Sequence, residues 1–336
     1  MSADEAARLA LAARRGAGLF ALRERALVAV RGRDRVRWLD GMLSNDVARL
    51  RPGRSSSGCY ALLLTPQGRI VCDFHVLARA DELWLETDAR GLPEVLARLE
   101  RHIIADDVTL EDRSAEIARI GVEGAGASRL LARALGELPQ LASECADDFS
   151  CAGHRICVAS FGWSGAPGFQ LIAQAGAEAS LAAALRAAAA PDAPLVEGDA
   201  EVLEILRIEA GIPRLHRELD EGVLPAEAGL MPRAVSLQKG CYTGQEIVAR
   251  IHSRDAESHH LVALRFAGAE AAPGAELCAG ERVVGSVTSS CRSASAGPIG
   301  LGFVRRPFDA EGTELRADGV PAQVASAPLV APTGDA

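Results

Sequence analysis

The sequence predicts an α+β protein with a small β-barrel at its C-terminal end. Up to Asp255, strand-like runs alternate with helical patterns, whereas later residues form short strand-like runs separated by Gly and Pro turns. A chain of 336 residues, 49% of them hydrophobic, is long enough to bury two or three cores. Composition therefore predicts an ordered protein of several domains.

The first part of the chain predicts a sheet with covering helices. The expected strands span 26–30, 60–64, 70–77, 83–86, 108–110 and 117–122, and the expected helices follow Asp34 or span 93–104 and 127–135. Residues 65–68 read TPQG, and proline at the second position with glycine at the fourth fits a type I turn. Asp73 and His75 share one face of a strand, and we interpret them as a polar cross-strand site.

The rest of the chain predicts two helices, an irregular segment and the barrel. The expected strands span 155–159, 169–173, 261–266, 282–287, 300–304 and 320–325, and the expected helices span 178–190 and 201–210. Residues 211–237 lack periodicity and contain three prolines. Such a long irregular segment in a compact protein usually carries a function or a docking surface.

Charge and composition exclude several classes of function. The net charge of −9 argues against nonspecific binding to nucleic acid or to an anionic membrane. No stretch approaches the ~20 apolar residues of a membrane span, and residues 1–15 lack the apolar core of a secretory signal. The eight cysteines form no C-x-x-C pair, which is typical of a reducing compartment. We predict a cytoplasmic protein without nucleic-acid or membrane partners.

The sequence contains no recognisable metal motif. His259 and His260 are adjacent in a predicted strand, so their side chains point to opposite faces. No H-x-x-x-H or H-E-x-x-H pattern is present. We therefore predict no stably bound metal.

Residues 239–246 read KGCYTGQE and are the most informative segment of the chain. Thr243 and Glu246 have the spacing of a capping box, in which each side chain bonds the backbone amide of the other residue. This spacing predicts a helix that begins near Gly244 and buries an apolar face starting at Ile247.

Cys241 lies just ahead of this predicted helix, where free amide groups and the helix dipole favour a thiolate. Lys239 is the only lysine of the chain, and its charge is a second reason to expect a thiolate. We interpret Cys241 as a functional thiol rather than a buried small hydrophobe. It can act as a nucleophile, as a docking thiolate, or as one ligand of an iron–sulfur cluster that takes its other ligands elsewhere.

Four further side chains are candidates with open alternatives. Tyr242 offers a ring and a hydroxyl beside the thiol, or it packs in the core. Gln245 orients the Cys241 loop or contacts a polar ligand, and Arg250 faces a cavity or solvent. Glu209 ends a predicted helix, where a negative charge is unfavourable, so it either contacts a ligand or pairs with a nearby arginine.

The KGCYTGQE segment resembles the signature of the YgfZ family. These folate-binding-type proteins are linked to iron–sulfur cluster assembly and repair and share the fold of aminomethyltransferase, the glycine cleavage T-protein. The likeness extends from about residue 25 into the C-terminal domain. It includes GRDR at 32–35 with LSNDV at 43–47, RIEAGIP at 207–213, LPAEAGL at 224–230 and VSL at 235–237.

The resemblance implies a three-domain ring with a central cavity. It assigns residues 20–115 and 195–255 to a discontinuous folate-binding-type domain and 116–194 to a second α+β domain. The barrel would span 256–330, with a tail at 331–336.

The resemblance also implies a function. The chain would bind tetrahydrofolate and serve as an accessory factor for iron–sulfur cluster assembly or repair. Its partners would be assembly proteins or cluster-bearing client enzymes. Cys241 would be the functional thiol, held as thiolate with the help of Lys239. Glu209 would anchor the pterin, and Tyr242, Gln245 and Arg250 would contact the cofactor or line its cavity.

The chain departs from the family patterns in two places. Aminomethyltransferases carry an aspartate that the segment 89–94 lacks, which leaves Asp88 or Glu94 as a replacement acid. YgfZ proteins use tryptophans as folate contacts, whereas Arg25 and Leu203 stand at those positions here. The alternative function is a folate-dependent aminomethyl or methyl transferase, and a third is a folate sensor without chemistry at the thiol.

Overall fold

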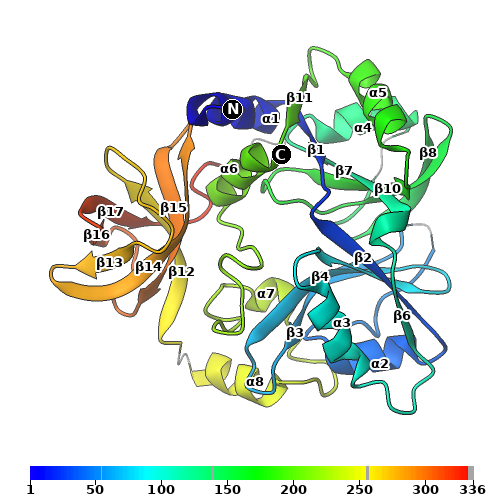
Figure 1. Cartoon of the computed structure of the whole chain (residues 1–336), viewed down its shortest axis with the longest axis horizontal. Helices are drawn as coiled ribbons and strands as arrows, with labels where there is room; N and C mark the ends of the chain where they lie inside the picture. The colour runs from blue at the N-terminus through cyan, green and yellow to red at the C-terminus, as the bar shows by residue number, and fades with distance from the viewer. Residues whose placement is uncertain (54, 138–139, 255–256, 332–336) are drawn as a thin grey trace.

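The computed structural model describes residues 1–53, 55–137, 140–254 and 257–331. Within these residues the strands form a five-stranded sheet, a six-stranded sheet and a closed six-stranded barrel. Figure 1 shows the barrel on one side of the molecule and the two sheets on the other, with α6 (Ala200–Ala210) and α7 (Met231–Ala234) between them. This arrangement confirms the predicted α+β class with a C-terminal barrel.

The five-stranded sheet is antiparallel, with the order β3-β4-β5-β2-β6. Its elements are β2 (Arg25–Arg31), β3 (Gly58–Leu64), β4 (Ile70–Ala78), β5 (Leu83–Asp88) and β6 (Thr109–Asp112), with helices α2 (Arg35–Met42) and α3 (Leu92–Glu100). The predicted turn between β3 and β4 forms, since the Gly68 amide donates to the Thr65 carbonyl at 2.8 Å. Leu39 of α2 and Leu99 of α3 are buried in the core of this unit.

The six-stranded sheet has the order β11-β1-β7-β10-β9-β8, in which only the β1–β11 pair is parallel. Its elements are β1 (Ala17–Ala21), β7 (Ile117–Glu123), β8 (Ala146–Cys151), β9 (His154–Ala159), β10 (Gly168–Gln174) and β11 (Leu195–Gly198), with helices α4 (Ala127–Leu135) and α5 (Glu178–Ala188). Leu130 of α4 and Leu181 of α5 are buried against one face. β1 and β11 complete this sheet, and they include residues 20 and 195, at which the two segments of the predicted first domain begin.

The other face of this sheet meets the five-stranded sheet in a layer that is partly apolar and partly charged. Leu77 of β4 packs in one cluster with Phe161 and Ile172. His75 stacks on Phe161, with ring centroids 3.8 Å apart and an interplanar angle of 9°. Glu86 is completely buried here. Charged groups are rarely buried without partners, so this layer is a candidate site.

The barrel is connected to the two sheets through α6. Its strands are β12 (His259–Phe266), β13 (Glu276–Ala279), β14 (Arg282–Ser293), β15 (Gly297–Arg305), β16 (Glu314–Ala317) and β17 (Val320–Ala325). On one side of α6, Leu206 packs against Ala10 of α1 (Ala3–Arg15), and on the other Ile208 packs against Ile299 of the barrel. Gly211 ends α6 with φ +73°, a geometry that glycine adopts without strain.

Residues 211–237 contain α7 as their only regular helix or strand, as the sequence predicts. They lead into α8 (Gln245–Arg254), the helix predicted from the KGCYTGQE segment. The predicted domain boundary at 255/256 and the predicted tail after residue 331 lie outside the described residues.

Candidate functional site

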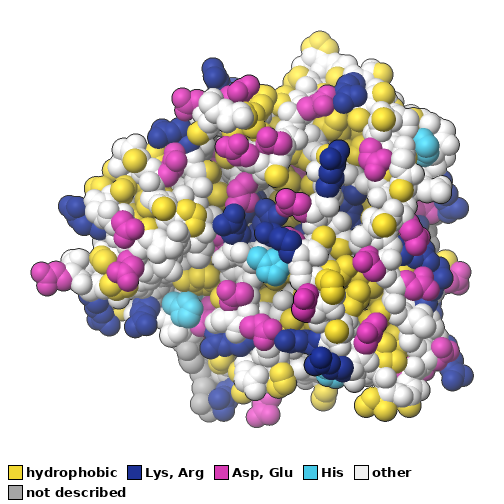
Figure 2. All heavy atoms as spheres, viewed as in Figure 1, with side chains coloured by type: hydrophobic (Ala, Val, Ile, Leu, Met, Phe, Trp, Pro, Cys, Tyr) yellow, Lys and Arg dark blue, Asp and Glu magenta, His cyan; other side chains and the backbone are white. Residues whose placement is uncertain are grey.

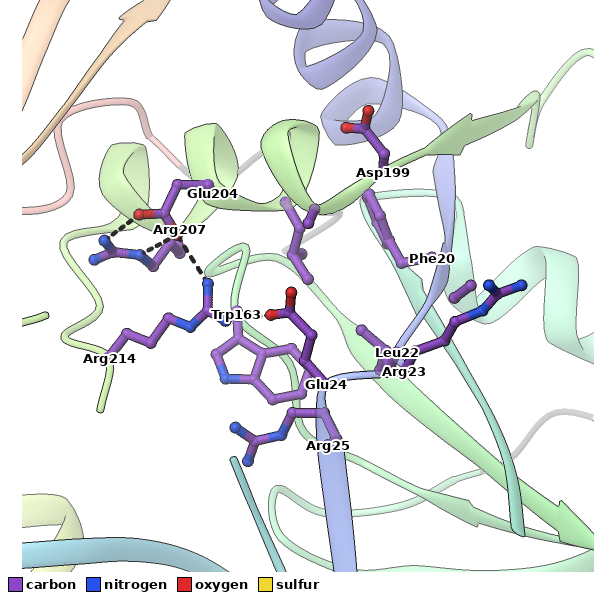
Figure 3. A pocket seen from close by; sticks show the side chains of 13 residues that line it. Phe20, Leu22, Arg23, Glu24, Arg25, Trp163, Asp199, Glu204, Arg207 and Arg214 are labelled. Carbon is purple, nitrogen blue, oxygen red and sulfur yellow. Dashed lines mark hydrogen bonds and ion pairs between the residues drawn. The ribbon is translucent and has the colours of Figure 1, made fainter. Parts of the chain in front are cut away.

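A cavity of about 250 Å³ opens where the two sheets and α6 meet. Phe20 and Leu22 come from β1 and the segment after it, Leu203 from α6, and Trp163 from the loop between β9 and β10. In Figure 3, Trp163 and Glu24 lie between Arg214 on one side and Leu22 on the other. The cavity therefore combines apolar walls with a large aromatic ring.

Arg25 lines this cavity and is held from behind by a buried carboxylate. Its Nε and Nη2 lie 2.5 and 2.7 Å from the two oxygens of Glu86, and Nη1 of Arg119 lies 2.5 Å from the first of them. Burial alone would raise the pKa of Glu86, but the charges of Arg25 and Arg119 lower it. Burial lowers the pKa of Arg119 to about 10. Glu86 is thus an ionised anchor that fixes Arg25 at the cavity wall.

A second group of charges forms the opposite wall, beside α6. Arg207 donates from Nε and Nη2 to both oxygens of Glu204, at 2.8 and 2.5 Å. Arg214 reaches Glu204 at 3.4 Å and Glu24 at 2.7 Å. Burial alone would raise the pKa of Glu204, but Arg207 and Arg214 lower it. The wall therefore presents ionised carboxylates that can also accept hydrogen bonds from a ligand. Figure 2 shows basic side chains gathered at the centre of this face.

Trp163 is fixed in the cavity by its neighbours. The guanidinium of Arg25 lies 5.0 Å from the centroid of the indole, within cation–π range. His75 and Phe161 meet the indole edge-on, with centroids 6.3 and 6.2 Å away. Trp163 lies between the strands predicted at 155–159 and 169–173, in a segment for which the sequence indicated no function.

Asp73 is a buried carboxylate in this region that does not use both of its oxygens in hydrogen bonds among the described residues. Oδ2 accepts from the Tyr60 hydroxyl at 2.8 Å, while Oδ1 has no hydrogen-bond partner among the described residues. Its charge raises the pKa of Arg25, although burial and Glu86 affect that pKa more strongly. His75 bonds Glu144 instead, at 2.7 Å. The cross-strand site predicted at Asp73 and His75 is therefore a polar network. Asp73 does not line the cavity, and its Oδ1 has no hydrogen-bond partner among the described residues.

Glu209 does not line the cavity. It is 2% exposed, and its Oε2 accepts from Nε of Arg14 at 3.0 Å while its Oε1 accepts from the Ser293 hydroxyl at 2.5 Å. The Glu209 carboxylate joins α1, α6 and the barrel, and the pterin contact implied by the resemblance stays a prediction. Glu204, five residues earlier on the same helix, does line the cavity.

Cys241 lies on the surface, in the segment before α8. It is the one exposed thiol of the eight, since the other cysteines are buried or half-buried. The helix begins at Gln245, one residue later than a capping box would place it, and Gly244 before it has φ +84°. Among the residues that the structure describes, the Thr243 side chain makes no hydrogen bond to the Glu246 amide. The helix is confirmed, and the predicted capping box does not form.

Lys239 is directed away from the expected position beside the thiol. Its Nζ lies 3.0 Å from Oδ1 of Asp40 and donates to the backbone carbonyls of Leu43 and Asn45 at 2.8 Å each. Burial lowers the pKa of Lys239, against the opposing effect of Asp40. The ammonium group of Lys239 bonds α2 and the loop after it, and the expected influence of Lys239 on Cys241 stays a prediction.

The other candidates from this segment also lie outside the cavity. Tyr242 is 7% exposed and belongs to the core of the first unit, and burial raises its pKa to about 12. Its hydroxyl has no partner within the described part of the chain. Gln245 is half-buried and Arg250 is exposed. The structure therefore separates the Cys241 segment from the cavity that the resemblance associated with it.

Asp88 and Glu94, the two replacement acids considered from the sequence, differ in their burial and in their contacts. Asp88 is 1% exposed and both its oxygens hold Arg90, at 2.9–3.0 Å and 2.7 Å, while Nη2 of Arg214 lies 3.6 Å away. Glu94 is exposed on α3. Asp88 is thus the one connected to the cavity, through Arg214.

Two kinds of feature, a metal-holding cluster and a membrane-spanning helix, are absent from the described residues. No group of three or more His, Cys, Asp or Glu side chains there has an arrangement that could hold a metal ion. No helix among those residues has the length and apolar character needed to cross a membrane.

Comparison with known proteins agrees with this architecture. Residues 2–239 match the GCVT N-terminal domain, and residues 259–331 match the glycine cleavage T-protein C-terminal barrel domain. This chain belongs to the glycine cleavage T-protein family. It is 31% identical over 313 residues to an aminomethyltransferase of Geobacillus kaustophilus, covering 91% of this chain and 84% of that protein. It is 32% identical over 325 residues to one of Rubrobacter xylanophilus, covering 95% and 84%.

A solved structure shows the same fold. The glycine cleavage system aminomethyltransferase T from Bartonella henselae superposes with a TM-score of 0.85 at 24% identity, over 97% of this chain and 89% of that one. The aminomethyltransferase-like fold expected from the sequence is therefore confirmed.

Within this family fold, the structure brings together positions that the sequence analysis treated separately. Arg25 and Leu203, which stand where YgfZ proteins are expected to carry folate-contacting tryptophans, both line the cavity. Trp163 lines the same cavity from a third segment. The signal for Trp163 was present in its isolated position within the glycine-rich loop GWSG. Only the packing of the second sheet on the first directs it inward.

Proposed function

We propose that this chain binds a reduced folate in the cavity at Trp163 and acts in folate-dependent transfer of an aminomethyl or methyl group. The observation that carries the proposal is the meeting of Arg25, Leu203 and Trp163 in one cavity. Membership of the T-protein family supports the same chemistry, because curated relatives are aminomethyltransferases.

The side chains of the cavity fit a folate in chemical class. The indole of Trp163 and the apolar surface of Leu203 suit the flat pterin ring. Glu204 offers ionised oxygens for its amino group, and the exposed Arg23 at the rim suits the carboxylates of the glutamate tail. The cavity of about 250 Å³ is smaller than the ~300–1,000 Å³ of sites that enclose a whole drug-sized ligand. We infer that the pterin is enclosed and the tail extends to the surface.

The bound folate would supply the nitrogen atoms that accept the one-carbon unit. The protein would orient the pterin through Trp163 and Glu204 and exclude water from the cavity. Asp73 lies behind the cavity wall and would act on the reaction through Arg25, whose pKa its charge raises.

The binding part of the proposal is tested by calorimetric titration of the purified protein with tetrahydrofolate. Trp163→Ala should weaken binding by about fivefold to tenfold, the effect of losing one aromatic contact. Trp84→Phe is the matched control, because Trp84 does not line this cavity. Absence of binding by the wild type would contradict the proposal.

The chemical part is tested by incubating the protein with tetrahydrofolate and a panel of aminomethyl and methylamine donors, and measuring one-carbon-loaded folate. Asp73→Asn should reduce turnover by at least about tenfold while leaving the folate Kd within about twofold. Binding without turnover on any donor would exclude a transferase and leave the second candidate.

The second candidate is the accessory function in iron–sulfur cluster assembly or repair, with cluster-bearing client enzymes as partners. The observation that favours it is the exposure of Cys241, the one such thiol of the chain, within the YgfZ-like segment. An exposed thiol on the surface can reach a partner protein, whereas the folate cavity lies elsewhere.

This candidate is tested by rescue of a bacterial strain that lacks its own YgfZ-type protein. The readout is the activity of a [4Fe–4S] enzyme under oxidative stress. Wild-type protein and the control Cys278→Ala should rescue, and Cys241→Ala should fail. Equal rescue by all three would contradict a function of the thiol.

A further inference from the structure

The loop that carries Trp163 is fastened at its base by one buried carboxyl group. Oε2 of Glu123, at the end of β7, accepts from the backbone amides of Trp163 at 2.9 Å and Ser164 at 2.7 Å. Glu123 and Ser164 are each 0% exposed. Two convergent amides on one oxygen fix the backbone on which the indole is mounted, since buried amides need acceptors.

The surroundings of Glu123 suit a hydrogen-bond acceptor rather than one member of an ion pair. No arginine, lysine or histidine pairs with it among the described residues, and its Oε1 has no hydrogen-bond partner there. Burial raises the pKa of Glu123, which favours the neutral form. The side chain is therefore suited to hold backbone amides rather than to bind a cation.

The loop is packed tightly against this carboxyl group. A Cβ atom added at Gly162 would lie 2.8 Å from both Cδ and Oε2 of Glu123 and 3.0 Å from Cα of Gly168. Real Cβ contacts are not this short, so any side chain at residue 162 would displace the carboxyl or the loop. The glycine is required for the contact, and the contact determines where the loop lies.

The position of the loop decides the shape of the cavity. Trp163 is the residue of this loop that lines the cavity, and it contacts Arg25 and His75 across the boundary between the two sheets. A change at Glu123 would therefore alter the cavity although Glu123 does not line it.

We propose that Glu123 is the positioning residue for Trp163 and thereby sets the affinity of the cavity for the flat ring of its ligand. This inference rests on the proposed folate site for the identity of the ligand. The placement of Trp163 by Glu123 stands independently of it.

The test uses the full chain labelled with 5-fluorotryptophan, which gives one ¹⁹F resonance for each of Trp38, Trp84 and Trp163. The Trp163 resonance is assigned with Trp163→Phe. Glu123→Gln, which keeps an acceptor oxygen of the same shape, should leave all three resonances in place. Glu123→Leu, which removes the acceptor, should move or broaden the Trp163 resonance alone.

A milder variant covers the case in which Glu123→Leu does not fold. Gly162→Ala keeps the carboxyl group but forces it apart from the loop, and it should also shift the Trp163 resonance. Glu227→Leu is the control for loss of a buried carboxylate away from the cavity, because Glu227 also accepts from a backbone amide, that of Leu224. Glu227 differs from Glu123 in that it also pairs with Arg69 and His259. Glu227→Leu should leave the Trp163 resonance unchanged.

Titration of the same variants with tetrahydrofolate gives the second readout. Kd should rise about fivefold to tenfold for Gly162→Ala and Glu123→Leu and stay within about twofold for Glu123→Gln and Glu227→Leu. An unchanged Trp163 resonance in Glu123→Leu or Gly162→Ala would overturn the inference. If the wild type binds no folate, the proposed function fails, while the resonances still decide whether Glu123 positions Trp163.

Discussion

Lys239 Nζ lies 3.0 Å from Asp40 Oδ1, which joins the segment before Cys241 to helix α2. The same ammonium donates to the backbone carbonyls of Asp40, Leu43 and Asn45. A compact ammonium with three donors suits several carbonyls that converge on one point, whereas the planar guanidinium of arginine does not. This geometry explains why the chain, whose 36 cationic side chains are otherwise arginines, has a lysine here.

Removal of this lysine should destabilise the protein. Lys239→Met would remove the cation beside Asp40, which keeps the amides of Val47 and Ala48 as donors, and would take this donor from three backbone carbonyls. The expected loss is about 2–4 kcal/mol in the free energy of unfolding. Lys239→Arg should lose a comparable amount for geometric reasons. Urea unfolding measures both, and Arg250→Met, at an exposed site, serves as the control. A wild-type midpoint in Lys239→Met would show that the contacts contribute little.

Cys241 should react with an aromatic disulfide reagent before any other thiol of the native protein. It is exposed, whereas Cys72, Cys151 and Cys157 are buried and the remaining cysteines half-buried. Stopped-flow absorbance should show one fast phase of one thiol per chain, lost in Cys241→Ser and kept in Cys278→Ser. A fast phase that survives in Cys241→Ser would place the reactive thiol elsewhere.

Glu209 should affect stability more than folate binding. Glu209→Gln breaks a buried ion pair with Arg14, and such a change typically costs about 3–5 kcal/mol. The folate Kd of the folded fraction should remain within about twofold, because Glu209 does not line the cavity. Calorimetry on Glu209→Gln and Glu204→Gln compares the two carboxylates. A selective loss of binding in Glu209→Gln would restore the pterin contact that the sequence suggested.

Acid should destabilise the protein through Glu144. Burial alone would raise the pKa of Glu144, but His75 and Arg233 lower it to about 2. A carboxyl with a depressed folded pKa stabilises the protein above its unfolded pKa of 4.5 and loses this effect as the pH falls toward 2. The loss is expected to reach about 3 kcal/mol. The free energy of unfolding should therefore change less with pH across this range in Glu144→Gln than in the wild type. An equal change in the two proteins would contradict the prediction.

Glu123 should give the opposite pH dependence. Its folded pKa is raised by burial, so the stability it contributes is complete below 4.5 and is lost as the pH rises through the folded pKa. Glu123→Gln should remove this decline. The stability of the variant relative to the wild type should therefore be greater at neutral pH than at acid pH. Chemical unfolding of the two proteins above pH 4.5 provides the comparison. Parallel curves would mean that Glu123 is ionised in the folded state.

Much of the local structure follows from local sequence patterns. The hairpin of β3 and β4 was predictable, because alternating residues flank a turn with proline and glycine at the required positions. The end of α6 at Gly211 was predictable from its glycine, and the start of α8 near Gly244 from the apolar spacing that begins at Ile247. Helix α1 was not predicted, because its buried face consists of alanines such as Ala6, Ala10 and Ala13, which give little hydrophobic contrast.

The site was less predictable than the fold, because its side chains come from distant segments. Residues 239–246 contain a thiol, a lysine, a tyrosine and a glutamine in a short run, and this short spacing indicated a single site. In the structure Lys239 bonds the loop after α2, Tyr242 packs in the core and Cys241 faces the surface. Sequence spacing gives the direction of a side chain only within a regular element, and this segment precedes one.

The sequence by itself determined the α+β class and the C-terminal barrel, since strands, helices and turns depend on residues close together in the chain, and its motifs indicated the aminomethyltransferase-like fold. The tertiary structure decided which carboxylate meets the cavity and which is buried. Glu204 and Glu209 lie on the same helix, five residues apart, and therefore point in different directions around its axis. Only the packing of α6 between α1, the barrel and the cavity turns Glu204 toward the cavity and Glu209 toward Arg14.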